Sequence, residues 1–301
     1  MDHNPTLAFK NKEDIIAYQE YQLKKLIHYC YQYSPFYKNL FDENKLVPND
    51  IQSINDLQKI PTTTKDDLQN KNEAFICVSK DKIIEYTSTS GTLGHPVTVV
   101  LTENDLTRLA YNEYCSFVCA DGSTHDVYQL MLTLDRQFMA GMAYYSGIRK
   151  MGAGIIRVGP GSPALQWETI KRLQPTAIVG VPSFIVKLLE YAKEHQIDYR
   201  SCAVKKAVCI GENIRNTDFS LNAIGKKIVN DWDIQLYSTY ASTEMQTAFT
   251  ECTQGNGGHM QPDLIIVEIL NDQNLQVAEG EWGEVTITTL GVEGMPLIRF
   301  K

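Results

Sequence analysis

Two short segments carry residue types suited to binding phosphate and a divalent cation. Residues 86–98 read Tyr-Thr-Ser-Thr-Ser-Gly-Thr-Leu-Gly-His-Pro-Val-Thr, with five small hydroxyl residues in seven positions and two glycines three apart. Backbone N–H groups freed by glycine form a concave nest for anionic oxygens, and hydroxyls add donors. The alternative is an ordinary surface turn rich in Ser, Thr and Gly. No Gly-Lys-Ser/Thr follows, which argues against a Walker-type ATPase or kinase.

The second segment is Tyr240-Ala241-Ser242-Thr243-Glu244. A hard divalent cation prefers carboxylate oxygen beside phosphate oxygens, so Glu244 is a candidate ligand for Mg²⁺. Taken alone, Glu244 also fits a solvated surface acid, and Tyr240 fits a core aromatic at the end of a strand.

The order of these segments resembles that of adenylate-forming enzymes (acyl-CoA synthetases, adenylation domains and luciferases), and most of all their phenylacetate–CoA ligase-like branch. Ser90–Pro96 is similar to the signature Ser-Gly-Thr-Thr-Gly-x-Pro, and Tyr240–Glu244 is similar to Tyr-Gly-x-Thr-Glu. Two departures are Leu93 for the second Thr and Ala241 for Gly, and the lysine that many members carry near His95 or after Pro96 is absent. Further matches lie at 175–183, 211–213, 283–290 and 296–301, so the resemblance covers almost the whole chain.

The resemblance implies ATP or AMP, Mg²⁺ and, as co-substrate, coenzyme A. It places the β- and γ-phosphates on Ser88, Thr89, Ser90, Gly91 and Thr92. It places the adenosine beside Gly211, Glu212, Asn213, Tyr240, Ala241 and Ser242. Thr243 then bonds the α-phosphate and Glu244 coordinates Mg²⁺, so that these two residues serve catalysis. Lys65 approaches the phosphates, although a solvated lysine at a helix start is an equal reading.

The segment Gln137–Tyr145 occupies the place where the family builds part of its acid-binding pocket. Its apolar and aromatic side chains suit an aryl or alkyl acid. The residues we assign to this pocket are Met142, Tyr145, Val181 and Pro182. For any one of them, packing in the core is the simpler reading.

Cys252 and His259, separated by six residues, are similar to a Glu-Cys…Gly-x-His segment of the branch. Structural zinc takes four nitrogen or sulfur ligands, and these residues supply only two. The expectation is an incomplete zinc site, and the alternative is a buried cysteine and an unrelated histidine.

The implied function is ATP-dependent activation of a carboxylic acid to acyl-AMP, followed by thioester formation with coenzyme A. In relatives, the final Arg-Phe/Tyr run continues into Thr-Gly-Asp, which holds the ribose, and into a C-terminal domain with a catalytic lysine. Both lie beyond Lys301. We therefore expect the N-terminal domain of an acid–thiol ligase, inactive or impaired by itself. The alternative is a non-catalytic nucleotide- or acyl-binding module.

The elements that must position these residues alternate in type. Residues 1–85 contain no glycine and predict a helical lobe, in which Asn11 caps a helix that ends at Ser34-Pro35. Apolar β-branched runs then alternate with helical segments, which predicts a mainly parallel α/β sheet. The runs 264–270 and 284–289 predict a small antiparallel edge or barrel. We expect subdomains at 1–85, 86–200 and 201–301, the second carrying the phosphate loop and the third the nucleotide and Mg²⁺ motif.

Composition narrows the class of protein. The 301 residues have a formal net charge of −8 and a pI of about 5.3, which argues against nucleic acid as a partner. No apolar run is long enough to span a membrane, no signal peptide is evident, and seven scattered cysteines form no disulfide framework. We expect a cytoplasmic protein that acts on a small-molecule acid and exposes enough surface to form homo-oligomers.

Overall fold

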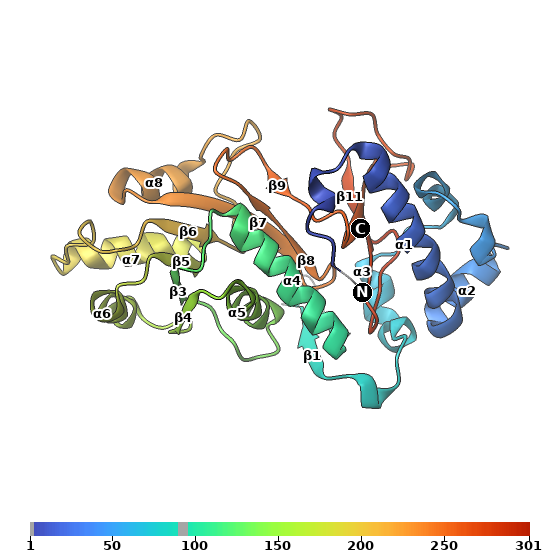
Figure 1. Cartoon of the computed structure of the whole chain (residues 1–301), viewed down its shortest axis with the longest axis horizontal. Coiled ribbons are helices and arrows are strands. Elements are labelled where there is room, and N and C mark those ends of the chain that lie inside the picture. The colour runs from blue at the N-terminus through green and yellow to red at the C-terminus, as the bar shows by residue number, and fades with distance from the viewer. Residues whose placement is uncertain (1–2, 90–95) are drawn as a thin grey trace. The chain divides into compact units, whose positions relative to one another are not determined.

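The computed structural model describes residues 3–89 and 96–301 (Figure 1). Its contacts group the chain into two compact units. Unit 1 contains Met1–Arg108, Thr243–Thr247 and Gln261–Lys301, and unit 2 contains Leu109–Ser242 and Ala248–Met260. The boundaries expected near residues 85 and 200 differ from those between the units, and the three-part division stays a prediction.

The helices of unit 1 begin at capping residues that the sequence makes visible. Asn11 caps α1 (Lys12–Tyr33) by accepting a hydrogen bond from the Asp14 N–H at 2.8 Å. Ser34 ends α1 and also caps α2 (Pro35–Glu43), because its hydroxyl accepts from the Tyr37 N–H at 3.3 Å. Pro35 fits the first helical position because it has no N–H to satisfy. Within the part predicted as a helical lobe, Ile54–Lys59 forms a 3₁₀ helix, η3. The next helix, α3 (Lys65–Asn70), carries Lys65 at its start.

Unit 1 also contains two antiparallel pairs of strands. β1 (Glu85–Ser88) pairs with β2 (Thr98–Leu101), and these strands flank the segment rich in Ser, Thr and Gly. β10 (Ile265–Leu270) pairs with β11 (Glu284–Thr289), which confirms the antiparallel edge predicted for this part of the chain.

The sheet of unit 2 is mainly parallel, as the alternating pattern predicted. Its strands are β3 (Val127–Leu130), β4 (Gly154–Arg157), β5 (Ala177–Gly180), β6 (Lys206–Cys209), β7 (Gln235–Ser242), β8 (Thr247–Glu251) and β9 (Gly258–His259). Their order is β4-β3-β5-β6-β7-β8-β9. The pairs from β4 to β7 are parallel, and β8 and β9 are antiparallel.

Helices cover both faces of this sheet (Figure 1). The side chain of Ile178 packs in a core with α6 (Pro163–Leu173), α7 (Pro182–Glu194) and α8 (Ala223–Asp231). Its neighbours Ala177 and Val179 pack in a second core with α5 (Met139–Met151) and the unit 2 part of α4 (Glu103–Cys119). Alternate residues of a strand point to opposite faces, so both faces of β5 are buried. Since helices cover both faces of the sheet, a ligand is expected at the carboxyl ends of the parallel strands.

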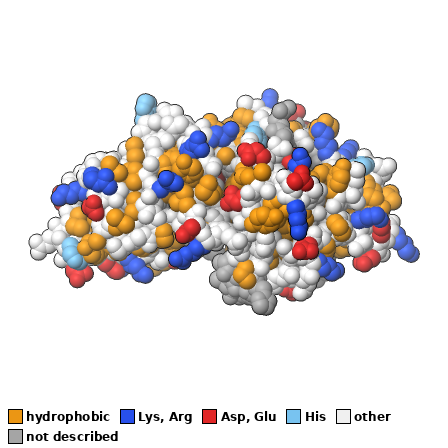
Figure 2. All heavy atoms as spheres, turned by 90° about the horizontal axis from the view of Figure 1, so that it is seen from below, with side chains coloured by type: hydrophobic (Ala, Val, Ile, Leu, Met, Phe, Trp, Pro, Cys, Tyr) orange, Lys and Arg blue, Asp and Glu red, His pale blue; other side chains and the backbone are white. Residues whose placement is uncertain are grey.

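On the face of the molecule that Figure 2 shows, charged side chains of one sign do not gather into a patch. On the face in Figure 2, basic and acidic side chains are interspersed, with apolar side chains between them. Within residues 3–89 and 96–301, no helix is both long enough and apolar enough to cross a membrane.

Candidate functional site

Lys65 and Glu244 form an ion pair within unit 1. Thr64 caps α3 in a reciprocal arrangement with Asp67, whose carboxylate accepts from the Thr64 N–H at 3.0 Å. Lys65 is the next residue, and its Nζ lies 3.6 Å from Oε1 of Glu244. The Glu244 side chain is only 10% exposed. Glu244 is therefore a buried carboxylate with a cationic neighbour, and the reading as a solvated surface acid is wrong.

Glu244 lies in a tight turn, Thr243–Gln246, that joins β7 to β8. Met245 and Gln246 are buried, and Gln246 has a φ of 50°, a left-handed conformation that side-chain-bearing residues seldom adopt. Such a conformation persists only where the surroundings hold it in place. Thr243 precedes Glu244 and is half-buried.

The structure describes the beginning of the predicted phosphate segment. Ser88 is the last residue of β1, and its hydroxyl donates to the Thr89 carbonyl at 3.2 Å. Thr89 is buried, and its Oγ1 accepts from the Val97 N–H at 3.0 Å. Ser90, Gly91 and Thr92 lie outside the described residues. Phosphate binding by this segment stays a prediction.

In unit 2, the carboxyl ends of β5 and β6 bring four of the predicted residues together. These are Val181, Pro182, Gly211 and Glu212. Gly211 has a φ of 73°, a backbone conformation that favours glycine. The Glu212 carboxylate accepts from the Ser183 N–H at 2.8 Å and from its hydroxyl at 2.7 Å, and so caps the first turn of α7. The neighbouring Asn213 accepts from the Arg215 N–H through Oδ1 at 3.1 Å.

The carboxyl end of β7 exposes an aromatic ring. Tyr240 is 58% exposed, and its ring centroid lies 6.0 Å from that of Phe249. Tyr240 is therefore not a core aromatic, and the reading of it as one is wrong. Ala241 is exposed, and Ser242 is half-buried. An exposed ring at the carboxyl edge of a parallel sheet can stack on a planar ligand.

The predicted acyl-pocket residues Met142 and Tyr145 lie on α5, and both are half-buried. The Tyr145 ring lies beneath two guanidinium groups, with Arg149 at 5.7 Å and Arg157 at 5.5 Å from its centroid. Tyr145 and Val181 pack against the same core of unit 2. Sequence reasoning missed both arginines, although Arg149 follows Tyr145 by four residues on α5 and that spacing could have revealed it; Arg157 comes from β4, which only the fold brings near.

The two predicted zinc ligands lie near β8 and β9. His259 is opposite Thr250 in the ladder and is exposed, whereas Cys252 is half-buried just beyond β8. Glu251 is already engaged, because Arg215 Nε and Nη2 donate to its carboxylate at 2.5 and 2.9 Å. Among the described residues, no cluster of three His, Cys, Asp or Glu side chains could hold a metal ion.

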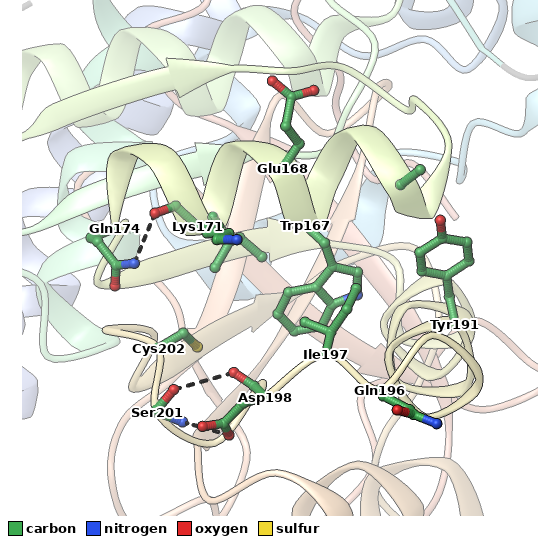
Figure 3. Close-up of a pocket in the computed structure, with 12 residues that line it drawn as sticks. Trp167, Glu168, Lys171, Gln174, Tyr191, Gln196, Ile197, Asp198, Ser201 and Cys202 are labelled. Atoms are coloured by element: carbon green, nitrogen blue, oxygen red, sulfur yellow. Dashed lines mark hydrogen bonds between the residues drawn. The ribbon is translucent and has the colours of Figure 1, made fainter.

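A pocket of about 550 Å³ lies in unit 2 between α6 and the segment that follows α7 (Figure 3). Trp167, Tyr191 and Ile197 line it together with Asp198 and Ser201. Ser201 donates to Asp198 through both its N–H and its hydroxyl, at 3.3 Å each, so this polar edge is internally satisfied. None of the residues predicted from sequence lines this pocket.

Comparison with known proteins identifies similar chains. The family model described as AMP-binding enzyme matches residues 27–293. The phenylacetate-coenzyme A ligase of Escherichia coli is 29% identical over 297 residues, covering 96% of this chain and 66% of that protein. The ligase of the same name from Thermus thermophilus is 27% identical, covering 100% and 67%. The chain spans about two thirds of the length of these relatives.

A crystal structure of 2-hydroxyisobutyryl-CoA ligase in complex with 2-HIB-AMP and CoA has the same fold. It matches with a TM-score of 0.89 at 21% identity, covering 98% of this chain and 64% of that one. At this identity the likeness concerns the fold alone. It confirms the predicted α/β class with a mainly parallel sheet and small antiparallel sheets.

Proposed function

Because the chain belongs to the family of AMP-binding enzymes, we propose that it uses ATP to convert a carboxylic acid to an acyl-adenylate, from which coenzyme A forms a thioester. Two findings support this proposal. The relatives that match nearly the whole chain are phenylacetate-coenzyme A ligases. A protein of the same fold is known in complex with 2-HIB-AMP and CoA.

The chemistry requires two displacements. A carboxylate oxygen attacks the α-phosphorus of ATP in line, the bond from that phosphorus to the bridging oxygen breaks, and pyrophosphate leaves. The thiol sulfur then attacks the acyl carbon, AMP leaves, and the thiol proton is lost. Positioning and neutralisation of phosphate charge supply most of the rate enhancement in such reactions.

The ion pair between Lys65 and Glu244 is the observation that carries the proposal. Glu244 offers hard oxygen donors of the kind that magnesium prefers, and Lys65, 3.6 Å away, offers a positive charge for phosphate oxygens, so the two groups that MgATP requires lie side by side. When bound, Mg²⁺ neutralises phosphate charge. Lys65 is positioned to contact phosphate oxygens, and the neighbouring Thr243 to donate a hydrogen bond to the α-phosphate.

The residues of unit 2 are suited to the organic parts of the substrates. The exposed ring of Tyr240 is available to stack on adenine, and Gly211 lets the backbone approach a ligand closely. Met142, Val181 and Pro182 are apolar, which favours an aryl or alkyl acid. Tyr145 adds an aromatic ring with two guanidinium groups over it.

The direct test is binding of non-hydrolysable acyl-sulfamoyl adenosines, measured by calorimetry on the full chain. The panel contains phenylacetyl, benzoyl, 2-hydroxyisobutyryl and straight-chain alkyl forms. Tighter binding of one acyl class than of ATP supports the proposal and names the acid. No binding of any analogue or of MgATP overturns it. Acid-dependent exchange of pyrophosphate into ATP, measured on the full-length protein, then separates an adenylating enzyme from a non-catalytic binding module.

We also propose that the protein binds zinc, self-associates and resides in the cytoplasm. Cys252 and His259 would supply two of the four ligands that structural zinc takes. Substitution of Co²⁺ tests this, because a thiolate–cobalt absorption band must disappear in Cys252→Ser. Sedimentation equilibrium over a range of concentrations tests self-association.

A further inference from the structure

Arg108 is a buried arginine of unit 1 whose guanidinium donates to three backbone carbonyls. Its side chain comes from α4, and the residue is 1% exposed. Nε donates to Leu290 O at 2.8 Å, Nη1 to Gln246 O at 2.7 Å and Nη2 to Leu264 O at 2.6 Å. One side chain therefore ties together three segments that are distant in sequence.

Burial of this charge is costly. Removal from water lowers the pKa of Arg108 to about 10, and the negative charges of Asp105 and Asp263 oppose that shift. Asp105 itself accepts from the N–H groups of Thr102, Glu293 and Gly294. The hydrogen bonds of the guanidinium thus go mainly to peptide carbonyls. Because burying such a charge costs stability, we look for its role in the positions of the segments that it binds.

One of the three carbonyls belongs to the turn that carries Glu244. Gln246 is two residues beyond Glu244, and it holds the left-handed conformation with φ of 50°. The bond from Arg108 Nη1 to Gln246 O anchors this residue, and with it the direction in which the turn presents the Glu244 carboxylate toward Lys65. A planar donor fork with fixed geometry defines such a direction better than a flexible ammonium group.

We propose that Arg108 is a positioning residue that orients Glu244 for a divalent cation bound to the nucleotide. This inference rests on the proposed function, because it takes Glu244 to be the cation's ligand. Arg108 touches neither the nucleotide nor the cation; it acts through the backbone of the turn Thr243–Gln246. Residues that hold a ligand in this way typically contribute tenfold to hundredfold to metal affinity.

The test compares the affinity for ATP with Mg²⁺ and without it. The ratio of Kd for ATP in EDTA to Kd for MgATP measures the gain that the cation provides. In Arg108→Lys, this ratio should fall about tenfold, while Kd in EDTA changes much less. Arg299→Lys is the matched control, since Arg299 is equally buried in unit 1, binds the carbonyls of Ile60 and Asn274, and has no hydrogen bond to the turn. Its ratio should equal that of the wild type.

A ratio in Arg108→Lys equal to that in Arg299→Lys overturns the proposal. A second measurement needs no variant: the Arg108 Nη1–H resonance of the wild-type chain, which reports on the bond to Gln246 O, should shift on addition of MgATP and stay in place with ATP in EDTA. An unmoved resonance with MgATP bound also overturns it. A wild-type chain that binds MgATP no better than ATP in EDTA instead contradicts the proposed function, so the two failures are distinguishable.

Discussion

The Nζ of Lys65 lies 3.6 Å from Oε1 of Glu244, which joins the start of helix α3 to the turn between β7 and β8. The lysine is 34% exposed and the glutamate 10% exposed, so the pair is accessible from the lysine side. Under the proposed function, MgATP would replace this ion pair, with the carboxylate binding the cation and the ammonium group binding phosphate oxygens.

Two substitutions separate the roles of this pair. Glu244→Gln removes the charge of the proposed Mg²⁺ ligand, so the gain in ATP affinity from Mg²⁺ should fall about tenfold or more, with little change in EDTA. Lys65→Met removes the proposed phosphate contact and should weaken ATP binding about tenfold both with and without Mg²⁺. Titration calorimetry measures both constants, and Lys59→Met, a lysine paired with Asp56 on the surface of the same unit, serves as control. Equal effects of Glu244→Gln in Mg²⁺ and in EDTA would contradict the assignment.

Glu113 makes the stability of the protein depend on pH. This residue of α4 is 3% exposed; its Oε1 accepts from Asn112 Nδ2 at 3.2 Å, and its Oε2 has no partner within the described part of the chain. Removal from water raises the pKa of Glu113 from 4.5 to about 8. The folded state therefore binds more protons between these values. Its contribution to stability is complete below pH 4.5 and is lost as the pH rises through about 8.

Glu113→Gln should flatten this dependence. The amide stays neutral, so the variant should be more stable than the wild type by about 3 kcal/mol near neutral pH, since each unit of pKa is worth about 1.4 kcal/mol. The difference should vanish at acid pH. Urea unfolding across the pH range measures it, and parallel curves for the two proteins would show that Glu113 is not the titrating group.

The buried pair between Arg215 and Glu251 should be worth far more than an exposed one. Glu251 is 1% exposed and also accepts from the Ser238 N–H at 2.7 Å. Glu251→Gln leaves the guanidinium without its anion and should reduce the free energy of unfolding by about 3–5 kcal/mol. The control is Glu190→Gln, which breaks the exposed pair with Lys227 and should cost about 1 kcal/mol or less. Similar losses in both variants would mean that burial does not govern the pair.

Close packing of α4 on α5 depends on a glycine. A Cβ added at Gly147 would lie 2.4 Å from Glu113 Cβ and 2.8 Å from its carbonyl carbon, which cannot move without shifting the helix. Gly147→Ala should therefore lower stability by about 1–3 kcal/mol, despite the better helix propensity of alanine. Ser146→Ala on the same helix should change it by less than about 0.5 kcal/mol. Thermal unfolding of both variants checks this, and a stabilised Gly147→Ala would contradict the close approach.

The sequence by itself determined the class of fold and the family. Alternation of apolar runs with helical segments predicted the mainly parallel sheet to which β3 to β6 belong, because a strand buried on both faces reads as a continuous apolar run. The cap at Asn11 was equally readable, since capping depends on local side-chain chemistry. Sequence periodicity did not separate α8 or the strands β8 and β9, which are short and flanked by polar residues.

Tertiary structure alone decided what surrounds the candidate residues. The burial of Glu244 beside Lys65 and the capping of α7 by Glu212 join segments that are distant in sequence. No local pattern marks Arg108, because a basic residue on an amphipathic helix is ordinarily solvated, and only the folded chain brings three carbonyls to its guanidinium. Local signals in a sequence report hydrogen bonds within a few residues; the partners of a buried charge are chosen by packing.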